Sequence, residues 1–251
     1  MGKIRIGTSG WSYPHWRGPF YPHEVRKHDW LAYYARHFSS AEINGAFYRI
    51  PKAATFKGWA EQVPADFVFT LKASRYITHL KKLREPSDSL QQLLTPAAEL
   101  GERLGPILFQ LPPRWRCNPD RLRTFLAELP QDHRYAFEFR DASWFTSEIE
   151  AMLKEANAAL CIHDHEDADC PDHLTADFTY VRLHGPGGKY EGRYSDRALQ
   201  HWAARMSEWA GAGHDVFCFF DNDAGGHAAL DALRLRDLLA RTGESSAGPS
   251  K

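Results

Sequence analysis

The amino-acid sequence predicts an α/β protein, a single-domain (β/α)8 TIM barrel. Eight short apolar segments alternate with segments of helical pattern over 251 residues, and strands that are separated by helices pair in parallel. Polar residues collect where these apolar segments end, which is the edge at which a barrel opens its binding face. We expect one domain over residues 1–242 and a disordered tail over residues 243–251, GESSAGPSK.

The predicted strands are short and apolar, and successive side chains along each of them alternate between two faces. In chain order they are Ile4–Gly7, Ser40–Asn44, Phe67–Lys72, Pro106–Gln110, a strand that begins at Tyr135, Ala158–His163, Thr179–His184 and Asp215–Phe220.

The segments between the strands show helical spacing of apolar residues or good helix propensity. Asn118 before Pro119 is a typical helix start, and Ser87 is a candidate N-cap. A turn-rich aromatic loop is expected at Gly45–Pro51. The predicted helices cover Asp29–Phe38, Ala53–Gln62, Ser87–Leu104, Asn118–Leu129, Phe145–Asn157, Asp196–Trp209 and Ala228–Leu239.

Composition limits the classes of function. The chain is 43% hydrophobic and 25% charged, with a formal net charge of -1. It therefore has no overall positive charge that would attract nucleic acid or a membrane surface, and any anion-binding site must be local. No apolar run approaches the ~20 residues of a membrane helix. No CxxC pair and no signal-peptide core occur, so we expect a cytoplasmic protein without membrane contact. The four cysteines are Cys117, Cys161, Cys170 and Cys218.

The fifth predicted strand and its end, Tyr135–Trp144, have the sequence YAFEFRDASW. Phe137 and Phe139 share one face, while Glu138 and Arg140 share the other, and charge arrives only at the end of the strand. A catalytic Glu138 predicts that Glu138→Gln abolishes function with the fold nearly intact. The alternative is a buried Glu138–Arg140 ion pair with a structural role only.

Closing the sheet would bring the polar residues at the strand ends into one ring. Buried charges of both signs are a costly filling for a barrel top unless they bind a ligand. The ring comprises Glu42, Asn44, Lys72, Gln110, Glu138, Arg140, His163, Arg182, His184, Asp221 and Asn222.

Within this ring we predict acid/base catalysis by Glu138 with His184, together with Glu42. The cations Lys72, Arg140 and Arg182 would bind an anionic group such as phosphate or carboxylate. Further substrate contacts are expected from Asn44, Gln110 and Asn222.

Aromatic residues in the loops after the strands would wall the barrel mouth and stack on a base or a sugar, or merely plug the barrel top. We expect Trp11, Tyr48 and Trp144 to contact substrate. The glycine-rich segment after the seventh strand offers backbone N–H groups to a phosphate, through Gly187 and Gly188. The full aromatic set is Trp11, Tyr13, Trp16, Phe20, Tyr21, Phe47, Tyr48, Trp115 and Trp144.

A metal centre is the competing interpretation for residues 163–167, HDHED, which lie near Cys161, Cys170 and His173. The run matches no defined ligand spacing, so a solvated acidic loop is favoured. No motif for an organic cofactor is present, the cofactor stays unknown, and a divalent metal is an open but not a favoured choice.

Several segments, in order, resemble the motifs of the DUF72 family, also called YecE-like proteins. They are GTSGWSYPHWRGPFYP, EINGAFYRIP, FVFTLKASRYITH, GPILFQLPP, FEFRDASW, YVRLHG and FFDNDAGGHA. The resemblance implies a TIM barrel and no established reaction. The sequence departs from the family pattern at Ala46, where Thr is usual, and at Asp221, where Asn is common.

We therefore predict an enzyme that acts on an anionic substrate, phosphorylated or nucleotide-like, by acid/base or hydrolytic chemistry, with hydrolysis and isomerisation both fitting. The alternative is a non-catalytic barrel that binds a small ligand or a nucleic-acid fragment. The sequence leaves the oligomeric state open.

Overall fold

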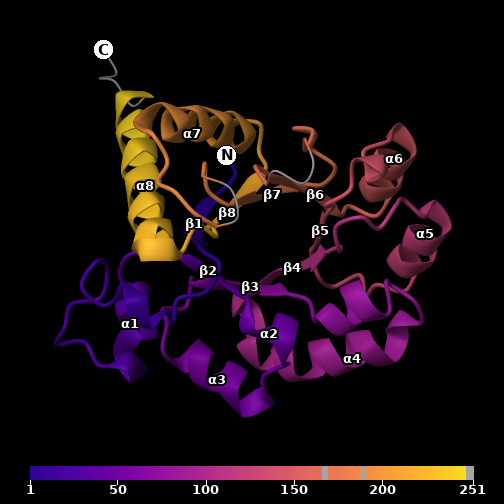
Figure 1. The fold of residues 1–251 in the computed structure, drawn as a ribbon, viewed down its shortest axis with the longest axis horizontal. Coiled ribbons are helices and arrows are strands. Elements are labelled where there is room, and N and C mark those ends of the chain that lie inside the picture. The colour runs from indigo at the N-terminus through magenta and orange to yellow at the C-terminus, as the bar shows by residue number, and fades with distance from the viewer. Residues whose placement is uncertain (166–168, 188–189, 247–251) are drawn as a thin grey trace.

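The computed structural model describes residues 1–165, 169–187 and 190–246 and confirms the predicted barrel. All eight strands are parallel and surround a common centre (Figure 1). Their bounds are β1 Ile4–Thr8, β2 Ser40–Ile43, β3 Val68–Lys72, β4 Leu104–Gln110, β5 Tyr135–Glu138, β6 Ala159–His163, β7 Phe178–Leu183 and β8 Asp215–Phe220.

Strands β1 and β2 are the two edges of the sheet, and they meet at their C-terminal ends. There the Gly10 N–H donates to the Glu42 carbonyl at 2.8 Å, and Ser9 forms a bridge with Glu42. Earlier along β1, a Cβ at Gly7 would overlap the Ser40 carbonyl, so glycine permits the close approach of the two strands. These contacts nearly close the barrel and place Glu42 beside the start of the first loop.

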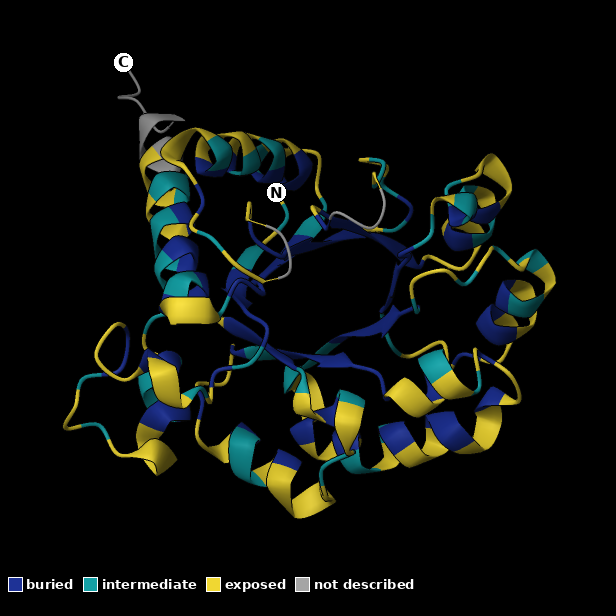
Figure 2. Cartoon of the chain, viewed as in Figure 1, coloured by how far each residue is buried: buried dark blue, intermediate teal, exposed yellow. Residues whose placement is uncertain are grey.

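The helices lie around the strands with their buried faces turned inward (Figure 2). They are α1 Trp30–Tyr34, α2 Gly45–Tyr48, α3 Ala53–Glu61, α4 Pro86–Ala97, α5 Pro119–Ala127, α6 Ser147–Glu155, α7 Asp196–Gly211 and α8 His227–Ser246. Short helical turns occur at η1 Pro14–Trp16, η2 Lys27–Asp29, η3 Tyr76–Leu80, η4 Ala98–Arg103, η5 Ala142–Trp144 and η6 Ala224–Gly226.

Three local predictions have different outcomes. The Asn118 cap is confirmed, because its side chain accepts a hydrogen bond from the Arg121 N–H at 2.9 Å. The Ser87 cap is wrong: helix α4 begins one residue earlier, at Pro86, and the Ser87 hydroxyl donates to Glu128 instead. The Gly45–Pro51 loop is also wrong in part, since its first residues form α2.

The apolar core has two parts. A large cluster fills the space between the strands and the helices. A smaller cluster occupies the barrel interior and includes Leu108, Ala136, Cys161, Phe178, Tyr180, Phe217 and Phe219. These side chains fill the lower barrel and lie beneath the buried charged residues at its C-terminal end.

The C-terminal segment is helical for longer than predicted, because α8 continues through Ser246 and residues 247–251 lie outside the described part of the chain. None of the helices in the described residues combines the length and hydropathy needed to cross a membrane.

Candidate active site

The site is built on β7, whose inward side chains change from apolar to charged along the strand. Phe178 and Tyr180 belong to the barrel-interior cluster, and Arg182 and His184 follow at the same two-residue spacing. All four side chains are buried. The alternation that fills the barrel therefore also places a guanidinium directly above an apolar plug.

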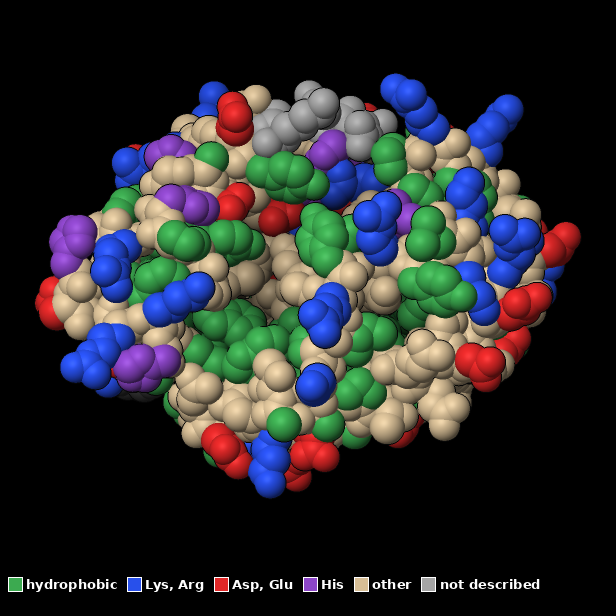
Figure 3. Space-filling view, turned by 60° about the horizontal axis from the view of Figure 1, so that its bottom comes forward, with side chains coloured by type: hydrophobic (Ala, Val, Ile, Leu, Met, Phe, Trp, Pro, Cys, Tyr) green, Lys and Arg blue, Asp and Glu red, His purple; other side chains and the backbone are tan. Residues whose placement is uncertain are grey.

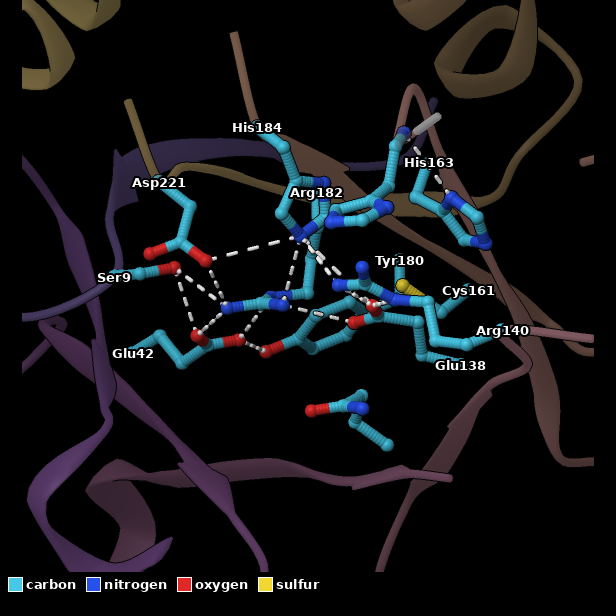
Figure 4. A network of polar contacts seen from close by, with 12 residues as sticks. Ser9, Glu42, Glu138, Arg140, Cys161, His163, Tyr180, Arg182, His184 and Asp221 are labelled. Carbon is cyan, nitrogen blue, oxygen red and sulfur yellow. Dashed lines mark hydrogen bonds and ion pairs between the residues drawn. The ribbon is translucent and has the colours of Figure 1, made fainter. Parts of the chain in front are cut away.

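Arg182 is the centre of a buried ionic network (Figure 4). Its guanidinium donates to both Glu42 oxygens, with Nε at 3.1 Å and Nη2 at 2.9 Å. It also donates to Glu138 at 2.9 Å and to Asp221 at 2.8 Å. Ser9 and Tyr180 complete the shell of Glu42 at 2.8 and 2.7 Å. One cation thus holds three carboxylates from three different strand ends.

Glu138 is held from two sides, since Arg140 donates to its second oxygen. Burial alone would raise the pKa of Glu138, but the charges of Arg140 and Arg182 outweigh burial and hold this pKa well below its ordinary value. The carboxylate is consequently ionised and fully buried. This geometry supports the structural alternative that the sequence left open for the Glu138–Arg140 pair.

His184 lies above the network, with its Nε2 at 2.9 Å from Arg140 and 3.1 Å from Arg182. Both partners can only donate, so Nε2 is the acceptor nitrogen of a neutral ring. Burial and then the charge of Arg182 lower the pKa of His184 well below its usual value. Proton uptake at Nε2 would break both contacts, which disfavours His184 as a base in this arrangement.

A cavity of about 520 Å³ opens at the barrel mouth beside this network. Figure 3 shows a hollow surrounded largely by hydrophobic side chains. Trp11 packs edge-to-face on Trp59 with ring centroids 5.2 Å apart, and Tyr48 at the rim is 77% exposed. The aromatic lining comprises Trp11, Tyr13, Phe47, Tyr48, Trp59 and Tyr190, and the polar lining includes Ser12, Asn44, Lys72, Asp221 and Asp223.

Two titratable groups in the cavity lining have pKa values that are shifted in opposite directions. Burial raises the pKa of Asp221 to about 6 against the opposing charges of Arg182 and Lys72. Burial, and next the charge of Arg182, lowers the pKa of Lys72 from its usual value. The Lys72 Nζ lies 4.7 Å from the centroid of the Phe47 ring. Such oppositely shifted groups in one cleft are characteristic of acid/base sites.

The profile of the family described as "Protein of unknown function DUF72" matches residues 5–251. The chain belongs to the DUF72 family.

Its relatives extend over nearly its whole length. The UPF0759 protein YunF of Bacillus subtilis (strain 168) is 29% identical over 270 residues, which cover 94% of each chain. A DUF72 family protein from Thermotoga maritima MSB8 superposes with a TM-score of 0.85 at 25% identity, covering 95% of this chain and 99% of that one. A DUF72 family protein from Enterococcus faecalis V583, at 20% identity, shares the fold with a TM-score of 0.77 and covers 94% and 95% of the two chains.

In this DUF72 chain the predicted site residues fall into distinct groups. Trp11, Asn44, Tyr48 and Lys72 line the cavity. The catalytic roles predicted for Glu138, His184 and Glu42 stay predictions, and these three residues lie in the buried network with Arg140 and Arg182, outside the cavity lining.

Other predicted contacts use their polar groups within the fold. The Trp144 indole N–H donates to the Trp115 carbonyl at 2.7 Å, and its ring stacks on Phe139 in the core. The Asn222 side chain donates to Gly192 and Asp231, at 2.9 and 3.0 Å.

The remaining predicted contact residues also use their polar groups in hydrogen bonds within the fold. The Gln110 amide donates to Leu111 at 2.7 Å, and the Gly187 N–H donates to Glu191 at 3.2 Å. Gly188 lies outside the described residues. Substrate contacts by these residues therefore stay predictions, without support from the cavity lining.

The predicted aromatic wall is divided in the structure. Tyr13 and Phe47 line the cavity with Trp11 and Tyr48. By contrast, Trp16, Phe20 and Tyr21 are buried and pack on one another beside α1, so they belong to the core. This second group therefore neither walls the mouth nor plugs the barrel top, since it packs against α1.

The competing metal interpretation has no support in the described residues, where no group of three or more His, Cys, Asp or Glu side chains is arranged to hold an ion. His163 Nε2 lies 2.8 Å from the Phe139 carbonyl. Asp164 accepts hydrogen bonds from the His184 N–H and the Tyr194 hydroxyl, which ties down the beginning of the run predicted to be a solvated loop.

Sequence reasoning gave no role to several cavity residues, among them Ser12 and Trp59. Tyr190, which lies just beyond the glycine-rich segment, was also missed. Asp221 was placed in the ring of strand-end residues but given no role, and Asp223 follows it two residues later. The charge following strand β8 was the available signal for these two acids.

Proposed function

We propose that the protein is an enzyme that binds a small, anionic, ring-bearing substrate in the mouth cavity, phosphorylated or nucleotide-like, and transforms it by proton transfer. The observation that carries the proposal is the meeting of Lys72 and Asp221, with oppositely shifted pKa values, in one aromatic-walled cavity. A catalytic acid works best when its pKa lies near the operating pH, and Asp221 meets this condition at slightly acid pH.

The lining supports an anionic and ring-bearing ligand. Among the described residues that line the cavity, Lys72 is the basic side chain, so it is the point at which a phosphate or carboxylate would gain charge pairing. Trp11 and Tyr48 offer aromatic faces or edges to a base or sugar ring. When Asp221 is protonated, the positive charge of Lys72 is less compensated and the attraction for an anion increases.

The buried network supports this chemistry from beneath the cavity. Glu42, Glu138 and Arg182 are fixed by multiple charge-assisted hydrogen bonds, so they need no reorganisation when charge changes on a substrate. In this proposal Asp221 is the general acid, and Lys72 binds the anion and receives or donates a proton.

The test is a screen of phosphorylated and carboxylated ring compounds for conversion, followed by mass spectrometry of each mixture. Lys72→Met should abolish conversion, while Lys57→Met, a change of an exposed lysine on α3, should leave it unchanged. Asp221→Asn should remove the limb of the pH profile near pH 6. If Lys72→Met and Asp221→Asn both converted a compound at the wild-type rate, the proposal would be refuted.

Tyr48 favours a second candidate, a non-catalytic ligand- or nucleic-acid-binding barrel. Its ring is 77% exposed at the cavity rim, and base stacking on exposed aromatic rings is a common mode of single-strand binding. Thermal melting of the wild type and of Tyr48→Ala, with and without a short single-stranded oligonucleotide, tests this candidate. Stabilisation that is lost in Tyr48→Ala, with no conversion of any compound, would favour binding over catalysis.

A further inference from the structure

Lys72 has an unusual set of neighbours for a buried cation. Within the described residues, no carboxylate lies at ion-pair distance from its ammonium, because Glu42, Glu138 and Asp221 all pair with Arg182. The Lys72 Nζ lies over the face of the Phe47 ring. The amine thus lies at the cavity wall, where a ligand can reach it.

Two effects raise the fraction of this amine that is neutral at a given pH. Burial lowers the pKa of Lys72, and the charge of Arg182 lowers it further, against the raising effect of the three acids. A lysine that is desolvated and lies near another cation is activated as a nucleophile, because more of it carries a free lone pair at a given pH.

Resting on the proposed function, we propose that Lys72 is the covalent nucleophile of the site and forms an imine with the carbonyl carbon of an aldehyde or ketone substrate. The geometry that carries this proposal is an amine without a carboxylate partner among the described residues, which faces an aromatic-walled cavity that also contains a carboxylic acid.

The step balances without an oxidant or a metal. The Nζ lone pair forms a C–N bond as the carbonyl π electrons move to oxygen, and a proton passes from nitrogen to that oxygen, giving a carbinolamine. Asp221 then protonates the hydroxyl, the C–O bond breaks, and one water leaves as a protonated imine forms. Hydrolysis returns the free amine. The iminium withdraws electrons from the adjacent carbon, which makes proton removal there easier.

The neighbours of Lys72 suit this step. Asp221, with a side chain that is 11% exposed, lines the same cavity and holds its proton at mildly acid pH. The Asn44 Oδ1 is buried without a hydrogen-bond partner in the described structure, so it can accept a bond from the carbinolamine hydroxyl. Trp11 and Trp59 limit water at the reacting atoms.

Pyridoxal 5′-phosphate is a suitable probe, since it combines an aldehyde, a ring and a phosphate. The intact protein is incubated with this probe at neutral pH, reduced with borohydride and mapped by peptide mass spectrometry. We expect Lys72 to carry clearly more label than the exposed Lys57, since burial and the charge of Arg182 lower the pKa of Lys72 and so leave more of its amine free to react. Label on surface lysines with none on Lys72 would overturn the proposal.

Two controls separate the imine from the anion site. Lys72→Arg keeps the charge but should lose the adduct, and its circular dichroism spectrum reports whether it is folded. Pyridoxine 5′-phosphate, which lacks the carbonyl, should raise the melting temperature of the wild type and protect Lys72 from label. Stabilisation by this analogue without any adduct on Lys72 would reject the imine and leave the proposed function standing. Failure of the compound screen would reject the proposed function itself.

Discussion

Asp221→Asn should make the protein more stable at neutral pH. The wild-type carboxyl is buried, and its pKa lies at about 6 in the folded protein against an ordinary value of 3.8. This difference corresponds to about 3 kcal/mol that the ionised group costs the folded state. The attraction of Asp221 to Arg182, at 2.8 Å, therefore does not offset the free energy needed to bury this third carboxylate of the network.

The sign follows from proton binding. Between about pH 4 and pH 6 the folded protein holds a proton on Asp221 that the unfolded chain has released, so the contribution of this group to the free energy of unfolding falls as pH rises. Asparagine keeps the shape of the side chain without the charge. The stability difference between variant and wild type should thus grow over this window and level off above it.

Urea denaturation at a series of pH values measures this difference directly. At pH 8 the variant should exceed the wild type by up to about 3 kcal/mol, or roughly 5–10 °C in melting temperature for a chain of this length. Asp237→Asn, at an exposed carboxylate on α8, is the matched control for loss of one carboxylate, and its stability should stay close to that of the wild type. A difference between Asp221→Asn and wild type that is independent of pH would refute the reasoning.

Three further substitutions test the packing of the site and fold. Glu138→Gln should lower the free energy of unfolding by about 3–5 kcal/mol, measured in urea, because two buried guanidinium groups lose the charge of Glu138. Wild-type stability would show that the network is dispensable. Gly7→Ala should lower the melting temperature, since its Cβ would overlap the Ser40 carbonyl at the β1–β2 seam. Asn118→Ala should cost about 1 kcal/mol, and an unchanged denaturation midpoint would contradict the assigned cap.

The Glu138→Gln expectation shows where sequence reasoning ended. Alternation along the fifth strand correctly placed Glu138 and Arg140 on one face, and the barrel followed from repeated alternation of this kind. The sequence placed Glu138 and Arg182 in one ring but did not reveal that they would form a direct ion pair across 44 residues of chain. With that contact, the substitution that was expected to spare the fold becomes a destabilising one.

The division between cavity and core was also beyond the sequence. Trp11 and Trp144 both follow strands and look equivalent by composition, yet Trp11 lines the mouth while Trp144 stacks on Phe139. The direction in which each loop folds decides the difference, and a hydrogen bond from Trp144 to the Trp115 carbonyl fixes one of them. Local pattern identifies such residues but cannot orient them.

Arg182 connects these observations although it does not line the cavity. Its guanidinium takes up three carboxylates, so Lys72 is left facing the cavity without one of them as a partner. The charge of Arg182 also lowers the pKa of Lys72, and it opposes the burial that raises the pKa of Asp221. A fully buried residue on β7 thus contributes, after burial itself, to the pKa shifts of both Lys72 and Asp221 in the cavity lining.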